Sequence, residues 1–425
     1  MERRGTSREA VWGEFRELHA VTSRHNVING MLCLCALLPS CIASVALWVS
    51  CSRTTPPHGS QPTNETYVGP STRPTNAEAW STWFTTSLDA ESFCSWARVE
   101  PFAIINVLFF VNVVCGFWVV GLIQRSFWLI DPYWTILPPL IAFWYAAHAM
   151  LLLSAPAVGQ PIIFTANVPR VVVWGTLVVL WSFRLTFSYC RRERFRFGDR
   201  EDWRYSDMAR RCPKMWWLAS FWAVGVAQQP LLVGITYPFQ ALLTDASEFG
   251  AADFVAALCA VSGLAISFAA DNDLATYMAL NSSLRDQNEP VVGILDTGLW
   301  RYSRHPNYFG EQLFWWSVGC GGAMISGRWY LIMGALLNSI CLASVTVMTE
   351  KKMLDRWEDP NRRSLYSEYQ RNVSVLIPLP PGFLRGCGSS NFIKPCSTEV
   401  IRSSIIPTQL LDTSGDRRDS SAAMW

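Results

Sequence analysis

The chain has 425 residues, of which 50% are apolar and 16% are charged. Soluble domains carry roughly a quarter charged residues, so this composition favours a membrane protein. The formal net charge of +2 excludes the strong basic excess of a typical nucleic-acid-binding protein, and we expect no nucleic acid partner. Most of the length therefore serves membrane-spanning segments and not several soluble domains.

The sequence contains eight apolar runs, most of which reach the roughly 20 residues that a helix needs to cross a bilayer. In chain order they are Val27–Ser50, Phe102–Ile123, Trp134–Ala155, Val171–Tyr189, Trp216–Ala241, Ala252–Ala270, Gln312–Ile325 and Trp329–Thr349. The seventh run is short, and its Gly319, Gly321 and Gly322 favour close packing in a hairpin with the eighth. Prolines in the third and fifth runs predict kinks. We therefore predict an all-α polytopic membrane bundle of about eight transmembrane helices.

The basic residues indicate the orientation of this bundle in the membrane. They cluster before the first run, between the fourth and fifth runs, and after the eighth, which places all three clusters on one side. The loops 156–169 and 244–251 on the other side contain no lysine or arginine. We therefore expect both termini and the polar loop 271–311 to lie in the cytosol.

The chain divides into four parts. We expect a cytosolic N-terminus, an additional transmembrane helix with a lumenal loop, a membrane domain and a disordered cytosolic tail, over residues 1–26, 27–101, 102–381 and 382–425 respectively. The first apolar run is too long for a cleaved signal peptide and predicts an uncleaved helix. The lumenal loop carries the glycosylation sequon Asn64-Glu65-Thr66, and its Cys51 and Cys94 could form a disulfide. The other cysteines show no metal-ligand spacing, so we predict no metal site.

The densest polar cluster runs from Gly298 to Glu311 and leads into the seventh apolar run. Arg301 and Arg304 are three residues apart, so they share one face if this stretch is helical, and paired guanidinium groups suit phosphate. Anchoring at the membrane surface is the alternative role for such a cluster, but anchoring does not require Asn307 or Glu311. We therefore predict a binding site for a charged, polar molecule, with lipid as the natural co-reactant.

Further polar residues lie within or at the ends of the apolar runs, where burial in lipid is costly and marks functional candidates. Gln228 and Gln229 precede a proline in the fifth run, and either line a pocket or accompany a structural kink. His148 in the third run is expected to make an interhelical hydrogen bond. Glu350 ends the eighth run, where its charge opposes the helix dipole, so it is either simply exposed or paired with His305 or an arginine of the cluster.

Several motifs together resemble those of one known family. Residues 301–311, Arg-Tyr-Ser-Arg-His-Pro-Asn-Tyr-Phe-Gly-Glu, resemble the signature of the steroid 5-alpha-reductase superfamily, and most closely its branch of membrane proteins of unknown function. Further segments are similar to that branch in the same order: Asp131-Pro132-Tyr133-Trp134, Arg184-Leu185-Thr186, Glu201-Asp202-Trp203-Arg204-Tyr205, Gln228, Ala270-Asp271 and Tyr366-Ser367-Glu368-Tyr369. The resemblance covers residues 102–381 and does not identify a substrate.

The resemblance implies a membrane enzyme that uses NADPH to reduce a polarised carbon–carbon double bond in a small lipid, such as a steroid, a sterol or an enoyl chain. It places the cofactor at the cytosolic face of the C-terminal half, bordered by Arg301, Arg304, His305, Asn307, Asp271, Tyr369 and Arg371. It also implies catalytic roles for Tyr308, His305 and Glu311, and a substrate pocket that includes Gln228 and Gln229. The expected location is an internal membrane such as the endoplasmic reticulum.

The sequence leaves two other functions open. Steroid-reducing members polarise their substrate with a glutamate and a tyrosine on N-terminal spans, whereas the first four apolar runs here contain no glutamate. Membrane methyltransferases of the isoprenylcysteine or phospholipid type bind S-adenosylmethionine through a related Arg-His-Pro-x-Tyr-x-Gly motif. They usually carry a Glu-Glu pair after the last helix, whereas Glu350 is followed by Lys351. The third class is a non-catalytic lipid-binding relative, and cofactor binding separates the three.

Overall fold

The computed structural model describes residues 28–29, 31–32, 35–52, 90–153, 166–193, 198, 201–357 and 359–383. Secondary structure in these residues is helical, apart from one isolated parallel β-bridge between Ser303 and Ser374. The predicted sequon at Asn64, the N-terminal segment 1–26 and residues 384–425 of the predicted tail lie outside this part of the chain.

Six helical segments of the described chain are long and apolar enough to cross a membrane. They are Pro101–Gln124, Ile130–Leu152, Val168–Arg192, Trp216–Thr244, Ala251–Asp286 and Trp329–Asp355. These segments support a multi-pass membrane protein in a lipid bilayer, as predicted. The first and seventh predicted spans correspond to Leu38–Ser52 and Pro306–Ser326, which are helical but do not belong to the six.

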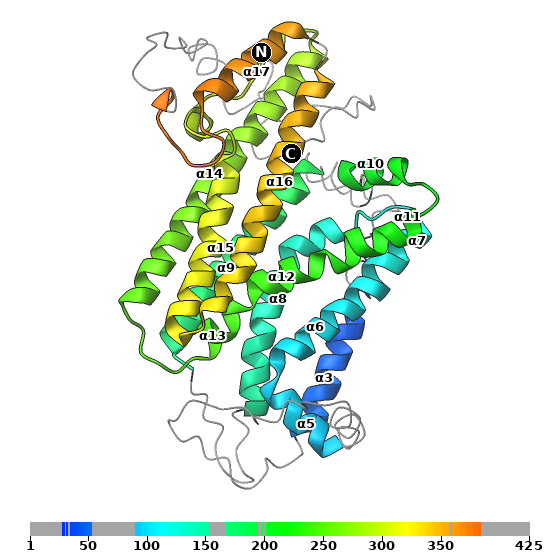
Figure 1. The fold of residues 1–425 in the computed structure, drawn as a ribbon, viewed down its shortest axis with the longest axis vertical. Helices are drawn as coiled ribbons and strands as arrows, with labels where there is room; N and C mark the ends of the chain where they lie inside the picture. Colours follow the sequence, from blue (N-terminus) through cyan, green and yellow to red (C-terminus); the bar gives the residue numbers. More distant parts are fainter. Residues whose placement is uncertain are drawn as a thin grey trace, which may run out of the picture.

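The N-terminal half supplies the lower part of the bundle in Figure 1. Its helices are α3 (Leu38–Ser52), α5 (Ala90–Val99), α6 (Pro101–Val111), α7 (Val119–Gln124), α8 (Ile130–His148) and α9 (Val168–Arg192). A π-helical turn over Asn112–Trp118 joins α6 to α7, so the two form one continuous span. Pro101 occupies the first turn of α6, where its missing N–H costs nothing.

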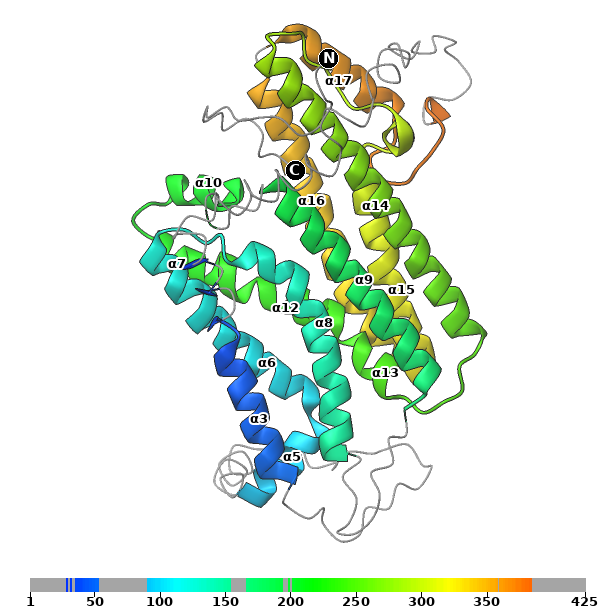
Figure 2. The same cartoon turned by 180° about the vertical axis from the view of Figure 1, so that it is seen from behind.

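The C-terminal half begins with a short helix that lies beside the bundle, across the direction of the long helices that follow it (Figures 1 and 2). Its helices are α10 (Trp203–Arg211), α11 (Trp216–Ser220), α12 (Gln228–Thr236), α13 (Pro238–Thr244), α14 (Ala251–Asp286), α15 (Pro306–Ser326), α16 (Met333–Arg356) and α17 (Pro360–Asn372). The predicted break in the fifth span is observed, because a π-helical stretch over Phe221–Val226 and two prolines divide it into α11, α12 and α13.

Helix α15 lies in the centre of the C-terminal half, packed against α13, α14 and α16. Its glycines permit this close approach, since a Cβ on Gly310 would lie 2.5 Å from the carbonyl oxygen of Gly263 on α14. A Cβ on Gly322 would lie 2.8 Å from Pro238 of α13. The chain then reverses at Gly327, whose φ of 69° favours glycine, and returns as α16. The predicted hairpin of the seventh and eighth runs is therefore confirmed.

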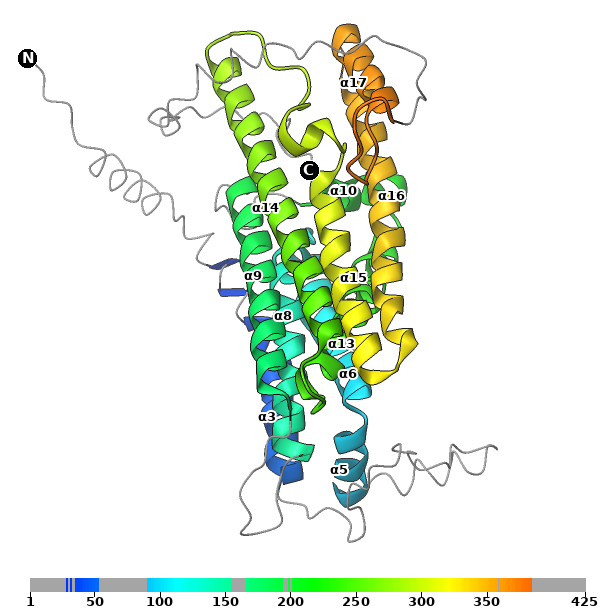
Figure 3. The same ribbon diagram turned by 90° about the vertical axis from the view of Figure 1, so that its left-hand side faces the viewer.

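Helix α14 is longer than the predicted span, because it continues from Ala270 to Asp286 without a helix-breaking residue. Its 36 residues extend about 54 Å, whereas the hydrocarbon core is about 30 Å thick. The C-terminal part of α14 therefore projects beyond the bundle together with the end of α16 and with α17, as Figure 3 shows. We call this projecting part the head.

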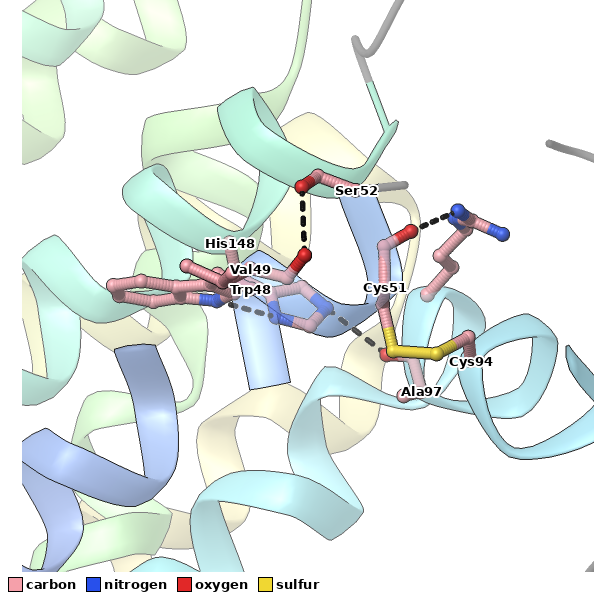
Figure 4. The surroundings of a disulfide bond; sticks show 8 residues. Trp48, Val49, Cys51, Ser52, Cys94, Ala97 and His148 are labelled. Atoms are coloured by element: carbon pink, nitrogen blue, oxygen red, sulfur yellow. Dashed lines mark hydrogen bonds between the residues drawn. A yellow bond between two sulfur atoms is a disulfide. The ribbon is translucent and has the colours of Figure 1, made fainter. Parts of the chain in front are cut away.

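A disulfide joins Cys51 of α3 to Cys94 of α5 at the end of the bundle opposite the head (Figures 1 and 4), a pairing that the sequence left open. Beside it, Trp48 of α3 donates its indole N–H to Nδ1 of His148 at 3.4 Å. The Nε2 of His148 lies 3.0 Å from the carbonyl oxygen of Ala97 in α5. His148 therefore makes the predicted interhelical hydrogen bond, and α3 is fixed to both α5 and α8.

Candidate functional site

The polar cluster of the sequence forms a short turn followed by a helix. Gly298 begins a 3-10 turn with a φ of 58°, and a Cβ there would lie 2.5 Å from a carboxylate oxygen of Asp273. Pro306 then occupies the first turn of α15, where its ring fixes a helical φ. We call residues 298–305 the motif loop. Its side chains and those of the first turn of α15 point to two separate regions of the molecule.

The first group of side chains contacts Glu350, which lies near the end of α16. His305 Nε2 lies 3.0 Å from Glu350 Oε1, and Arg304 Nε lies 3.3 Å from the same oxygen. Gln370 of α17 donates its amide N–H to Glu350 Oε2 at 2.8 Å. The His305 side chain is 1% exposed and those of Glu350 and Arg304 are each 12% exposed. The expected partnership of Glu350 with the motif is therefore observed, and it joins the motif loop to α16 and α17.

A cavity of about 440 Å³ lies in the head, next to this cluster. Its walls come from α14, the motif loop, α16 and α17. They include three arginines, five aromatic side chains and one carboxylate: Arg285, Arg304, Arg362, Tyr277, Trp300, Trp357, Tyr366, Tyr369 and Asp359. This combination suits a ligand that carries both negative charge and a flat ring.

Hydrogen bonds and ring contacts hold these walls in place. Arg362 donates its Nε–H to the carbonyl oxygen of Gly293 at 2.7 Å, and its guanidinium carbon lies 4.3 Å from the centre of the Trp357 ring. Tyr369 donates its hydroxyl to the carbonyl oxygen of Trp300, which joins α17 to the motif loop. Burial raises the pKa of the Tyr369 phenol, so this hydroxyl remains a donor at neutral pH.

The second group of predicted site residues forms a buried ion-pair network around Arg184 of α9. Arg184 Nη1 lies 2.7 Å from Asp271 Oδ2, and its other terminal nitrogen pairs with Glu311. Asn307 donates to Asp271 Oδ1 at 3.2 Å, and Trp181 donates to Glu311 Oε2 at 2.9 Å. Asp271, Asn307 and Glu311 thus connect α9, α14 and α15, and none of them lines the cavity.

The remaining predicted residues occupy separate places. Tyr308 stacks on His305 with ring centres 5.2 Å apart and planes 17° apart, so it belongs to the Glu350 side of the motif. Arg301 and Arg371 are exposed, and neither lines the cavity. Arg304 and Tyr369 are the two predicted cofactor residues that do line it.

The two glutamines predicted for the substrate pocket make contacts between helices. Gln228 accepts the indole N–H of Trp134 from α8 at 2.9 Å. Gln229 donates to the side-chain oxygen of Asn106 from α6 at 2.8 Å. Neither lines the cavity. The two amides therefore satisfy polar groups beside a broken helix, and their role in a substrate pocket stays a prediction.

Sequence reasoning did not assign a role to Arg285, Arg362 or Trp357, which complete the cavity. Arg362 and Trp357 lie in the segment that follows the last apolar run, where basic and aromatic residues are usual membrane-interface features. The sequence signal that could have predicted this part of the cavity is Trp357 followed by Arg362 and Arg363, in a segment that is not itself apolar.

Comparison with known proteins identifies a family match over residues 117–373, to the family described as "Protein of unknown function (DUF1295)". A relative from the fission yeast Schizosaccharomyces pombe, named "Uncharacterized protein C594.04c", is 26% identical over 314 residues, covering 69% of this chain and 84% of that protein. No solved structure matches. The matched range contains α8 to α17 and all of the motif and head residues described above. The chain therefore belongs to the DUF1295 family, which is related to steroid 5-alpha-reductase-like membrane proteins.

Proposed function

We propose that the chain is an NADPH-dependent membrane oxidoreductase that reduces a carbon–carbon double bond of a small lipid. The observation that carries this proposal is the cavity in the head, where three arginines and five aromatic side chains meet beside the motif. Its volume of about 440 Å³ lies within the range of small-molecule sites. The family relationship supports the same direction, because the motif residues are those that the resemblance links to the cofactor.

The residues present fit a phosphorylated nucleotide. Guanidinium groups bind phosphate oxygens through parallel hydrogen bonds, and the aromatic walls suit a flat base. Arg304 Nε pairs with Glu350 at 3.3 Å, and the same residue lines the cavity. A bound anion would supply a second partner for this guanidinium. Arg285, Arg304 and Arg362 would hold the phosphates, with Tyr369 positioning the motif loop.

The cofactor supplies a hydride when it is bound. The protein has to hold the lipid and stabilise the negative charge that develops on it. Tyr308 and His305 are the proposed catalytic residues, because their rings stack on one another and His305 shares Glu350 with Arg304, which lines the cavity. Glu311 is bound to Arg184 and Trp181, so its proposed role is to position α15 against α9.

The proposal includes the finer topology and location. Eight transmembrane helices, cytosolic termini and an internal membrane such as the endoplasmic reticulum would place the disulfide of α3 and α5 in an oxidising lumen. The head lies at the other end of the bundle and would then face the cytosol. Basic residues at the head, including Arg285 and Arg362, agree with this orientation.

The direct test is to measure the affinity for NADPH in detergent for wild type, Arg304→Ala and Arg362→Gln. Hydrogen bonds to charged groups contribute roughly 1.5–3 kcal/mol, so each variant is expected to weaken binding roughly 10- to 100-fold. Arg363→Gln is the matched control, because Arg363 is exposed on the same helix and does not line the cavity. Unchanged affinity in both cavity variants would remove the cavity from the cofactor site. Binding of S-adenosylmethionine in place of NADPH would favour a methyltransferase, and binding of neither would favour a non-catalytic relative.

A further inference from the structure

The chain that follows α17 forms a strap, residues 373–383, which returns along the motif loop. The backbone N–H of Arg304 donates to the carbonyl oxygen of Ser374 at 2.8 Å. Leu379 donates its backbone N–H to the carbonyl oxygen of Tyr302 at 3.0 Å. The strap is therefore fixed to the same loop that presents Arg304 to the cavity.

The strap and the motif loop beside it expose several apolar side chains. Ser374 is buried towards the loop, whereas Val375 is 43% exposed and Ile377 is 57% exposed. Phe383, at the end of the strap, is 65% exposed, and Tyr302 of the motif loop is 42% exposed. These exposed apolar residues lie outside the six membrane-spanning segments. They indicate a surface that contacts lipid or another molecule.

Two arginines adjoin this apolar surface. Arg301 precedes Tyr302 in the motif loop, and Arg371 lies at the end of α17 just before the strap. Both are exposed, and neither lines the cavity. Glu368 is also exposed on α17, so the net positive charge of this region is small. Binding of a partner would therefore depend on the burial of apolar surface as well as on charge.

The position of the strap along the bundle identifies what covers it. In Figures 1 and 2 the lower turn of the strap lies at about the same height as α10, which lies beside the bundle just above the end of α7. Helix α7 is the last part of the membrane-spanning segment Pro101–Gln124. The strap therefore lies at the edge of the bilayer, where apolar and aromatic side chains enter the headgroup region and arginines reach lipid phosphates.

We propose that this surface binds an anionic phospholipid headgroup of the cytosolic leaflet, through the apolar side chains of the strap and the two adjoining arginines: Tyr302, Val375, Ile377, Phe383, Arg301 and Arg371. The inference rests on a cytosolic head, because the cytosolic leaflet carries the negative surface potential. It does not depend on the cofactor, since the surface and the cavity share no residue.

The test uses the full chain in mild detergent and counts bound lipids by native mass spectrometry, with phosphatidylserine and phosphatidylcholine of identical acyl chains. Wild type is expected to bind phosphatidylserine more tightly. Arg301→Gln combined with Arg371→Gln is expected to lower the affinity for phosphatidylserine about 25-fold, because each arginine near the surface contributes roughly fivefold. Val375→Ser combined with Ile377→Ser is expected to weaken the binding of both lipids.

Two matched variants separate lipid binding from folding and from net charge. Arg301→Lys with Arg371→Lys keeps the charge and is expected to keep most of the affinity. Lys351→Gln with Arg363→Gln removes the same charge from exposed positions of α16 and α17 and is expected to bind as wild type does. Equal binding of the two lipids by wild type, equal loss in the glutamine and control pairs, or no effect of the serine pair would each overturn the proposal.

Discussion

At the scale of the residue, Glu350 holds the elements of the head together. It contacts His305 and Arg304 of the motif and Gln370 of α17, while its own backbone belongs to α16. A carboxylate this buried is stable only when cationic or hydrogen-bonding groups surround it. Its removal would leave the Arg304 charge without its acidic partner.

We therefore expect Glu350→Gln to destabilise the protein by roughly 3–5 kcal/mol, the usual result of breaking a buried ion pair from one side. The measurement is thermal unfolding of the purified protein in detergent, followed by intrinsic fluorescence. Glu368→Gln is the control, because it removes the same charge from an exposed position of α17. Similar melting temperatures for the two variants would contradict the role given to Glu350.

The sequence predicted some contacts of the site and not others, for a physical reason. A glutamate at a helix C-terminus opposes the helix dipole, so a cationic partner for Glu350 could be expected. The ion pairs of Arg184 with Asp271 and Glu311 could not be expected, because these residues lie far apart in the chain. They meet only through the packing of three helices. The same holds for the cavity, whose walls join α14 to α17 across more than seventy residues of chain.

At the scale of the element, α10 illustrates how one side chain determines a helix end. Asp202 accepts the backbone N–H of Arg204 at 2.8 Å and pairs with the guanidinium of Arg204 at 2.6 Å. It therefore acts both as the N-cap and as one half of an ion pair. At Trp203, the first residue of α10, Lys352 Nζ of α16 lies 3.5 Å from the ring centre, which fixes α10 against α16.

Asp202→Ala is expected to destabilise α10 by about 1 kcal/mol, whereas Asp202→Asn keeps the cap and loses only the ion pair. The measurement is hydrogen exchange of residues 203–211, corrected for the intrinsic effect of pH. Burial alone would raise the pKa of Asp202, but the hydrogen bond and charge of Arg204 hold it below its ordinary value. Its stabilising effect should therefore be complete above the unfolded pKa of about 3.9 and be lost as pH falls through the lower folded pKa. Equal exchange in the two variants at neutral pH would exclude a capping role.

Helix positions followed from apolar runs, but helix ends did not. The run that ends at Ala270 gave no reason to stop the helix there or to extend it, and the polar residues up to Asp286 face the head instead of lipid. The seventh run starts at Gln312, whereas α15 begins six residues earlier at Pro306, because proline in a first turn begins a helix regardless of hydropathy. Hydropathy reports which residues can contact lipid, whereas contacts inside the protein determine where these two helices end. Hydropathy therefore did not predict their ends.

At the scale of the whole molecule, the two ends of the bundle differ in chemistry. One end carries the disulfide that joins α3 to α5, and the other carries the arginine-lined cavity. Disulfides persist in oxidising compartments, whereas basic residues concentrate on the cytosolic side of membrane proteins. Both observations agree with the orientation proposed above, although they depend on unrelated forces. The disulfide also joins the additional helix α3 to the rest of the bundle, at the end away from the cavity.

This orientation predicts the pattern of proteolysis in sealed microsomes. Trypsin added outside is expected to cleave between α9 and α11, where Arg210 and Arg211 are exposed at the end of α10, and to leave Arg53 in the segment 51–101 uncut. Mass spectrometry of the fragments before and after addition of detergent measures this, since detergent should expose the protected sites. A non-reducing gel of the same fragments should keep the pieces that carry Cys51 and Cys94 together. Cleavage at Arg53 in intact vesicles would reverse the orientation, and it would remove both the cytosolic cofactor and the anionic leaflet from the side of the head.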